Sequence, residues 1–175
     1  MLYGSTNWQV VTGGITRLDV DAIVNAANSS LLGGGGVDGA IHRAAGPELI
    51  HECRLLGGCK TGQAKITKGY NLAARHIIHT VGPVWRGGKY GEHELLASCY
   101  RTSFEIAVQR RLGGMAFPAI STGIYRFPVV KAARVASDTI AGCLDNHPGV
   151  MEQMIFVCFD SAATDAFEAA VASKV

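Results

Sequence analysis

The chain has 175 residues, of which 48% are hydrophobic and 17% are charged, and its formal net charge at pH 7 is +2. This composition excludes a disordered tail, and so mild a positive charge gives no indication of a nucleic-acid-binding protein. No apolar run approaches the ~18 residues of a membrane-spanning helix, so we expect a single globular domain, residues 1–175, without a membrane partner.

Five cysteines are scattered along the chain without a C-x-x-C pair. Four of them lie in helical or strand patterns, where a reduced cysteine packs as a small hydrophobic residue. The first residues do not combine a basic segment with an apolar core, as a secretion signal would. We therefore expect a reducing, cytoplasmic location.

Two short strands are predicted in the N-terminal part of the chain. Trp8 to Val11 is expected to form the first, and Thr12-Gly13-Gly14 would end it. Ala22-Ile23-Val24 is a short apolar run of the kind found in strands that are buried on both faces. These two segments predict the first strands of a buried sheet.

A polar loop and four consecutive glycines follow the second predicted strand. Asn25 and Asn28 come after it, and Gly33 to Gly36 lead into a helix expected to begin at about Val37. Glycines adopt positive φ easily and can turn several N–H groups outward, and a helix N-terminus adds the positive end of its dipole. These features predict a site for phosphate oxygens, in preference to a merely flexible surface loop.

Asp38 and His42 are four residues apart and therefore share one face of this helix. Asp38 lies in the first turn, where the helix dipole favours the ionised carboxylate, so it is better suited to orient a water molecule than to deprotonate one. The alternative interpretation is that Asp38 only complements the helix dipole and has no part in catalysis. His42 is expected to be a packing residue or a neighbour of Asp38, because one His beside one Asp forms neither a metal site nor a catalytic triad.

The remainder of the chain continues the alternation of helices and strands. Strands are predicted at 64–67, 76–81, 115–120 and 154–159, and helices at 47–56, at 93–112, from near Pro128 to before Pro148, and from a cap at Ser161 to about Ala172. Strands that alternate with helices throughout predict an α/β fold, a three-layer α/β/α sandwich.

A second loop, Ser121-Thr122-Gly123, follows one of these strands and leads through Tyr125 to a helix. Ligands of such sheets bind beyond the carboxyl ends of the strands, so this loop and the glycine loop would hold a diphosphate between them. An ordinary strand-to-helix turn is the alternative. Tyr125 would stack on a sugar or a base, or else pack with its hydroxyl bonded. Phe159 is expected to be a core residue, with an adenine platform as the alternative.

Four segments in a fixed order carry a resemblance to a known family. They are NAAN at 25–28, GGGGVDGAIHRAAGP at 33–47, HTVGPVW at 79–85 and FPAISTGIY at 117–125. Together they resemble macrodomains of the MacroD type, close to the bacterial O-acetyl-ADP-ribose deacetylases, over nearly the whole chain. The resemblance implies a central mixed sheet of six strands, which periodicity alone does not give.

The resemblance also implies roles for individual residues. Asn28 would hold the distal ribose, and Asp38 corresponds to the family's proposed proton acceptor, so these two are the expected catalytic residues. Ile15 would offer its backbone to adenine. The residues expected to contact the substrate are Gly14, Ile15, Asn25, Asn28, Gly34, Gly35, Gly36, Val37, Asp38, His42, Ser121, Thr122, Gly123, Ile124, Tyr125, Arg126 and Phe159.

The chain departs from the family pattern at two positions. The family reads Gly-Asp-Ile-Thr where this chain has residues 13–16, and Gly14 cannot replace that Asp, which accepts a hydrogen bond from the adenine amino group. One charge-assisted hydrogen bond is worth roughly 1.5–3 kcal/mol, so we expect ADP-ribose to bind about tenfold more weakly or worse. Arg126 stands where the family has Gly, and its guanidinium would contact phosphate, narrow the opening or point into solvent.

The function implied is that of a hydrolase in which water attacks an ester at the distal ribose. It would release acetate from O-acetyl-ADP-ribose, or an acidic side chain from mono-ADP-ribosylated protein. Its partners would be ADP-ribose, its esters and ADP-ribosylated proteins, and we expect the chain to act as a monomer. A non-catalytic ADP-ribose reader is the alternative, which Gly14 makes more plausible; both need the same pocket, and only turnover separates them.

Three other kinds of site are disfavoured. The spacing of Gly34, Gly36 and Gly39 fits the dinucleotide pattern G-x-G-x-x-G, but the glycines do not follow their strand immediately and the chain lacks the length for a second substrate domain. Residues 58–61 lack the adjacent Gly-Lys of a Walker loop, and residues 51–53 lack the second His of a zinc motif. We therefore expect neither a cofactor nor a metal ion.

Overall fold

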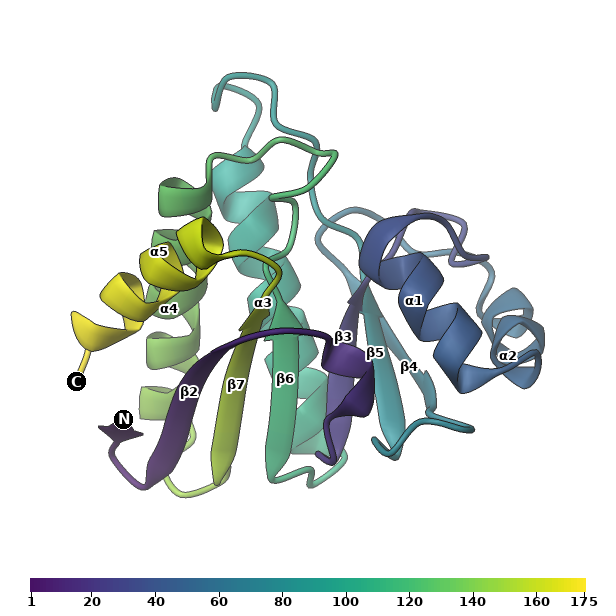
Figure 1. Ribbon diagram of the computed structural model, residues 1–175, viewed down its shortest axis with the longest axis horizontal. Coiled ribbons are helices and arrows are strands. Elements are labelled where there is room, and N and C mark those ends of the chain that lie inside the picture. The colour runs from purple at the N-terminus through teal and green to yellow at the C-terminus, as the bar shows by residue number, and fades with distance from the viewer.

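One sheet of seven strands forms the centre of the molecule in the computed structural model, which describes residues 1–175 (Figure 1). The strands lie in the order β1-β2-β7-β6-β3-β5-β4. All neighbours are parallel except at the two edges, where β1 and β4 are antiparallel to the strands beside them. The bounds are β1 (Leu2–Tyr3), β2 (Thr6–Thr12), β3 (Ala22–Ala26), β4 (Ala64–Lys68), β5 (His76–Thr80), β6 (Gly114–Pro118) and β7 (Gln153–Cys158).

Helices cover both faces of this sheet. They are η1 (Ile15–Arg17), α1 (Gly36–Ala45), α2 (Glu48–Leu56), α3 (Glu92–Gln109), α4 (Val129–Asn146) and α5 (Ser161–Ala172). One apolar cluster joins the sheet to α1 and α2, and another joins it to α3, α4 and α5. Ile23 belongs to the first cluster and Val24 to the second, as expected of a strand buried on both faces. The three-layer α/β/α sandwich with a mixed sheet is confirmed.

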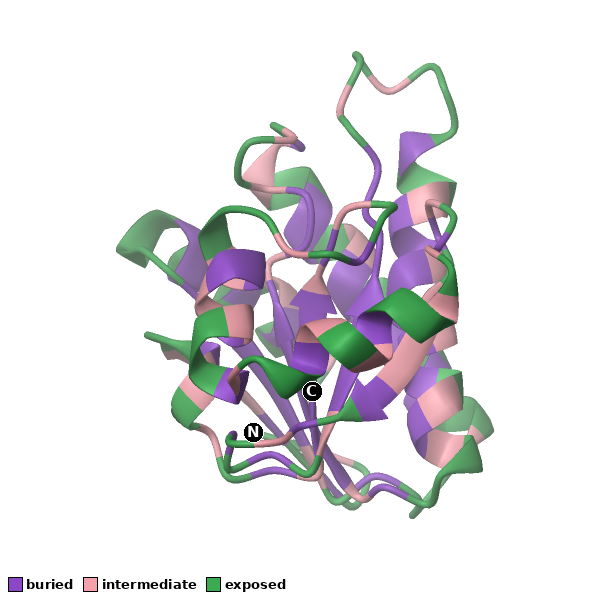
Figure 2. Cartoon of the chain, turned by 90° about the vertical axis from the view of Figure 1, so that its right-hand side faces the viewer, coloured by how far each residue is buried: buried purple, intermediate pink, exposed green.

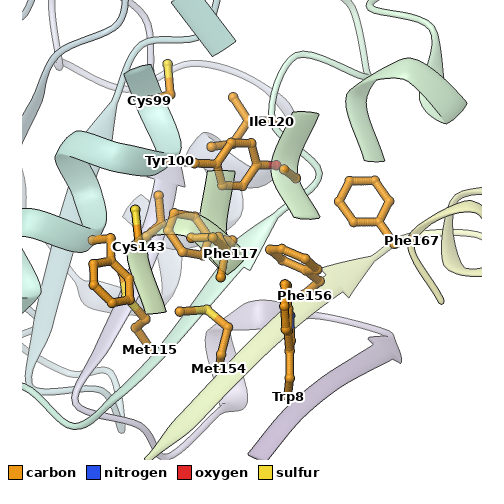
Figure 3. Close-up of a cluster of buried hydrophobic side chains, with 14 of the residues drawn as sticks. Trp8, Cys99, Tyr100, Met115, Phe117, Ile120, Cys143, Met154, Phe156 and Phe167 are labelled. Atoms are coloured by element: carbon orange, nitrogen blue, oxygen red, sulfur yellow. The ribbon is translucent and has the colours of Figure 1, made fainter. Parts of the chain in front are cut away.

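The larger cluster is built around aromatic side chains (Figure 3). Phe156 on β7 lies at its centre, with its ring 5.6 Å from that of Trp8 on β2 and 5.3 Å from that of Phe167 on α5. Such edge-to-face contacts join the sheet to the helix that follows it. All five cysteines are buried and free, and burial raises the pKa of the Cys99 and Cys143 thiols to about 11. The four cysteines that lie in helices or strands pack as small hydrophobic residues, as predicted, and Cys59 lies in a loop.

Several details differ from the prediction. The sheet has a seventh strand because Leu2–Tyr3 pairs with β2, and two residues carry no periodic signal. Ser161 is not the cap of α5: Asp160 is, and its carboxylate accepts a 2.8 Å hydrogen bond from the Ala163 N–H. The strand expected at 22–24 continues to Ala26, so Asn25 belongs to the strand and not to the loop after it. None of the helices combines the length and the apolar character needed to cross a membrane.

The glycine-rich loop 86–91 is fastened to the start of α3 by Glu92. One carboxylate oxygen accepts hydrogen bonds from the N–H groups of Arg86 (2.9 Å) and Gly88 (2.8 Å), and the other accepts from that of Tyr90 (2.6 Å). Burial acts to raise the pKa of Glu92, but these backbone N–H donors outweigh it and lower the pKa to about 2.

We expect Glu92→Gln to lower the free energy of unfolding at neutral pH. A carboxyl group whose pKa is lower in the folded protein stabilises the fold above its ordinary pKa of 4.5, and this contribution is lost as pH falls through the folded pKa of about 2. The difference between wild type and variant should therefore shrink between those two values, as measured by urea unfolding across that range. The exposed Glu94→Gln is the control. A difference that stays constant as the pH falls would contradict this role of Glu92.

Candidate functional site

A cavity of about 390 Å³ opens at the carboxyl ends of β3, β6 and β7, the edge of the sheet where ligands of such folds bind. The chain brings three segments to it from distant parts of the sequence. The first comprises residues 26–28 and 34–38, and the second is residues 118–125. The third is a C-terminal group of Val157, Phe159, Asp160 and Ala163. Gly82 and Val129 also line the cavity. Figure 2 shows the mostly exposed loops above the buried strands.

Most of the residues predicted to contact a substrate line this cavity. The two predicted loops face one another across it, and the members that line it are Asn28, Gly34, Gly35, Gly36, Val37, Asp38, Ser121, Thr122, Gly123, Ile124, Tyr125 and Phe159. The structure thus brings together segments that the sequence separates by some eighty residues. Which of them contact a ligand stays a prediction.

Five of the predicted residues do not line the cavity. Asn25 is wholly buried because β3 runs to Ala26, so its side chain lies beneath the site. His42 lies behind Asp38, and the Ile15 side chain packs in the core. Gly14 and Arg126 are exposed at the surface.

Phe159 was expected in the core, and this expectation is wrong. Strand β7 ends at Cys158, so the ring lies beyond the sheet, 73% exposed, and forms part of the cavity wall. An exposed aromatic ring at a cavity is suited to stack on a flat ligand, the alternative considered for it. Tyr125 is half-buried, and its carbonyl accepts a 2.8 Å hydrogen bond from the Trp85 N–H, which ties its loop to the segment after β5.

Asp38 and Asn28 direct polar atoms at the same point. A methyl group at Gly34 would lie 3.0 Å from Asp38 Oδ2 and 3.3 Å from Asn28 Nδ2. Asp38 is buried, and its other oxygen accepts a 2.9 Å hydrogen bond from Asn25 Nδ2 and lies 3.4 Å from His42 Nε2. Asn28 is fixed because it donates to the Gly33 carbonyl (2.8 Å) and accepts from Ser30. The carboxylate oxygen Oδ2 and the amide nitrogen of Asn28 thus lie close to one point beside Gly34.

Gly82 was not predicted to belong to the site, although it lies in the segment HTVGPVW. A side chain there would collide with Ser121 Oγ, so this close approach requires glycine. Ser121 itself has a φ of +67°, and its buried hydroxyl has no hydrogen-bond partner within the protein. Buried hydroxyl groups normally have a partner, so Ser121 Oγ is an exception beside the cavity. Asp160 also lines the cavity and was predicted neither as a cap nor as a site residue.

This chain is similar to known proteins of one family. A family model described as Macro domain matches residues 24–136. A macro domain-containing protein of Mesorhizobium japonicum is 60% identical, over 94% of this chain and 93% of its own, and a Cronobacter sakazakii protein named O-acetyl-ADP-ribose deacetylase is 54% identical, over 86% of each chain.

Solved structures of macrodomains have the same fold as this chain. A glycine-to-valine mutant of the Oceanobacillus iheyensis macrodomain with ADPR superposes with a TM-score of 0.89 at 40% identity, over 94% of this chain and 91% of that one. The Trypanosoma brucei macrodomain in complex with ADP-ribose gives a TM-score of 0.87 at 43% identity, over 93% and 68% of the two chains. The fold, the family model and the relatives lead to one conclusion: this chain belongs to the macro domain family.

Proposed function

We propose that the cavity binds ADP-ribose and that the chain hydrolyses esters at the distal ribose. The substrates would be O-acetyl-ADP-ribose and proteins that carry mono-ADP-ribose on acidic side chains. The observation that carries this proposal is the convergence of Asp38 Oδ2 and Asn28 Nδ2 over Gly34. The relative named O-acetyl-ADP-ribose deacetylase and the related macrodomain with bound ADP-ribose support it.

The cavity suits a nucleoside diphosphate. Its volume of about 390 Å³ falls within the range of roughly 300–1,000 Å³ found for ligand sites. The residues that line it include no Lys or Arg, so the phosphates would be held by N–H groups of the glycine loop, the N-terminus of α1 and the loop at Ser121. Phe159 would support the adenine ring at the other end.

The proposed reaction is attack of water on the ester carbonyl. Asn28 would orient the distal ribose, and the water would lie between Asp38 and the substrate's own diphosphate, which polarise it together. The new bond joins the water oxygen to the carbonyl carbon, and the bond from that carbon to the ribose oxygen breaks. One proton of the water ends on the ribose oxygen, and the other is released to solvent with the acetate. Acetate and ADP-ribose leave.

The experiment that tests this proposal combines calorimetric titration of ADP-ribose with an acetate-release assay on O-acetyl-ADP-ribose. Binding together with turnover supports the hydrolase. Binding without turnover would make the chain a reader of ADP-ribose, for which the same cavity is sufficient. Absence of both would assign the cavity to another ligand.

Gly14→Asp is expected to tighten ADP-ribose binding about tenfold or more. Gly14 has φ −95° and ψ 135°, and nothing lies within 4 Å of an added Cβ, so Asp fits there without strain. A carboxylate at this position would restore an acceptor for the adenine amino group, worth roughly 1.5–3 kcal/mol. Calorimetry measures the change, and Gly14→Ala is the matched control. Equal tightening by Ala would show that the carboxylate is not responsible.

A further inference from the structure

Three polar side chains form a buried row behind Asp38, one from each of three neighbouring strands. Asn25 on β3 and His79 on β5 are register partners, and Thr67 on β4 is the diagonal neighbour of His79. None of the three is more than 2% exposed. They lie on the face of the sheet that packs against α1 and α2, among apolar side chains such as Ile23 and Ile77. Polar groups in such surroundings need partners.

Hydrogen bonds run continuously along this row to the carboxylate. Asn25 Nδ2 lies 2.9 Å from Asp38 Oδ1 and 3.1 Å from His79 Nδ1. On the far side of the ring, His79 Nε2 lies 2.9 Å from Thr67 Oγ1, and that hydroxyl donates to the Lys68 carbonyl at 3.1 Å. The Asn25 amide oxygen has no partner, so the two N–H bonds alone fix the orientation of this amide.

The donor and acceptor roles in the row depend on the tautomer of His79, whose Nε2 also lies 4.0 Å from Cys53 Sγ. Burial, assisted by the nearby His42, lowers the pKa of His79 to about 3, so the ring is neutral and carries one N–H. With the Thr67 hydroxyl donating to the Lys68 carbonyl, the consistent arrangement is a ring that donates from Nε2 and accepts at Nδ1. Asn25 therefore gives one N–H to the ring and the other to Asp38.

The reverse orientation of Asn25 is unfavourable. Its amide oxygen would then face the Asp38 carboxylate oxygen, and two acceptors would meet in a buried site without a proton between them. The row thus supports an Asp38 that accepts hydrogen bonds at Oδ1. Its other oxygen, Oδ2, stays directed towards Gly34 and the Asn28 amide.

We propose that Asn25 and His79 are positioning residues for the reaction, acting through Asp38 without contact to the substrate. This inference rests on the proposed hydrolase function and extends it to residues of the sheet. Asn25 holds the carboxylate in place, and His79 fixes the amide of Asn25. Displacement of a reacting group by 1 Å can reduce a rate about 10²-fold, so a group that fixes the carboxylate affects turnover more than binding.

The first test replaces Asn25 with Leu, which keeps most of the volume and removes both N–H donors. We expect kcat for acetate release to fall at least about tenfold and the Kd for ADP-ribose to stay within about threefold of wild type. Retained ADP-ribose binding shows that the variant is folded. Wild-type turnover in Asn25→Leu would overturn the proposal.

A pair of variants at His79 separates positioning from packing. In His79→Asn the amide oxygen occupies the place of Nδ1 and can accept from Asn25, whereas His79→Leu offers no acceptor. Both remove the ring, so both affect the stability of the fold. We expect His79→Asn to retain kcat within about threefold of wild type and His79→Leu to lose at least about tenfold. Equal turnover of the two variants would overturn the role of His79.

The protonation of His79 gives a readout that does not depend on activity. In ¹⁵N NMR spectra of the wild type we expect a neutral ring with its proton on Nε2, unchanged between about pH 5 and pH 8. A ring protonated on Nδ1 overturns the proposal even where the enzyme is active. If the wild type releases no acetate, the proposed function fails, and the NMR result still decides the proton arrangement on its own.

Discussion

Replacement of Asp38 by Asn is expected to reduce acetate release from O-acetyl-ADP-ribose by about 10²-fold or more, because the group that orients the attacking water is lost. Asp38 Oδ2 and the Asn28 amide are directed at one point, and the variant keeps the shape of the side chain while removing its charge. Binding of ADP-ribose should be unchanged or tighter, because a carboxylate near a diphosphate is repulsive. Steady-state kinetics and calorimetry on the same preparation measure the two effects.

The control for this experiment is Asp165→Asn, an exposed carboxylate on α5 that does not line the cavity. It should match wild type in both assays. Near-full turnover by Asp38→Asn would remove Asp38 from the reaction. The substrate's own phosphate would then be the remaining group able to polarise the water, and the convergence over Gly34 would serve binding alone.

The sequence predicts the layers of this fold better than its edges. The apolar run Ala22-Ile23-Val24 indicates the buried strand β3. The amphipathic segment at 93–112 spans several turns, so its periodicity identifies the helix α3, Glu92–Gln109. The strand Leu2–Tyr3 is too short for any period, and its pairing with β2 depends on tertiary contact. The mixed character of the sheet came from the family resemblance, which implied six strands, and the order of the strands comes from the structure alone.

The sequence predicts the loops of the site, because these follow the ends of strands. It does not predict which side chains meet across neighbouring strands. The glycine loop after β3 and the Ser121-Thr122-Gly123 loop after β6 both follow parallel strands. They must therefore lie at the same edge of the sheet, and both line the cavity. The sequence predicts Asn25 just beyond the end of a strand, but β3 continues to Ala26 and the side chain of Asn25 is buried. Its partners His79 and Thr67 lie far away in sequence, and only the adjacency of β3, β5 and β4 joins them.

Gly34→Ala is expected to reduce kcat by about 30-fold, which corresponds to about 2 kcal/mol and lies within the usual cost of overpacking. The added methyl group would stand 3.0 Å from Asp38 Oδ2 and 3.3 Å from Asn28 Nδ2, closer than such contacts normally are. Both side chains must then move away from the point at which they converge. A displaced carboxylate orients the attacking water less well, so the loss should appear in the rate of acetate release.

Gly35→Ala is the matched control, because it adds the same methyl group one residue further along the loop. Gly35 has φ −93° and ψ −174°, a backbone conformation open to alanine, and nothing lies within 4 Å of the new Cβ. We expect its kcat to stay within about threefold of wild type, whatever small change occurs in ADP-ribose affinity. If the two alanine variants lost turnover equally, the loop would act through its overall flexibility. A loss confined to Gly34→Ala would instead identify the point between Asp38 and Asn28 as the place where the ester is attacked.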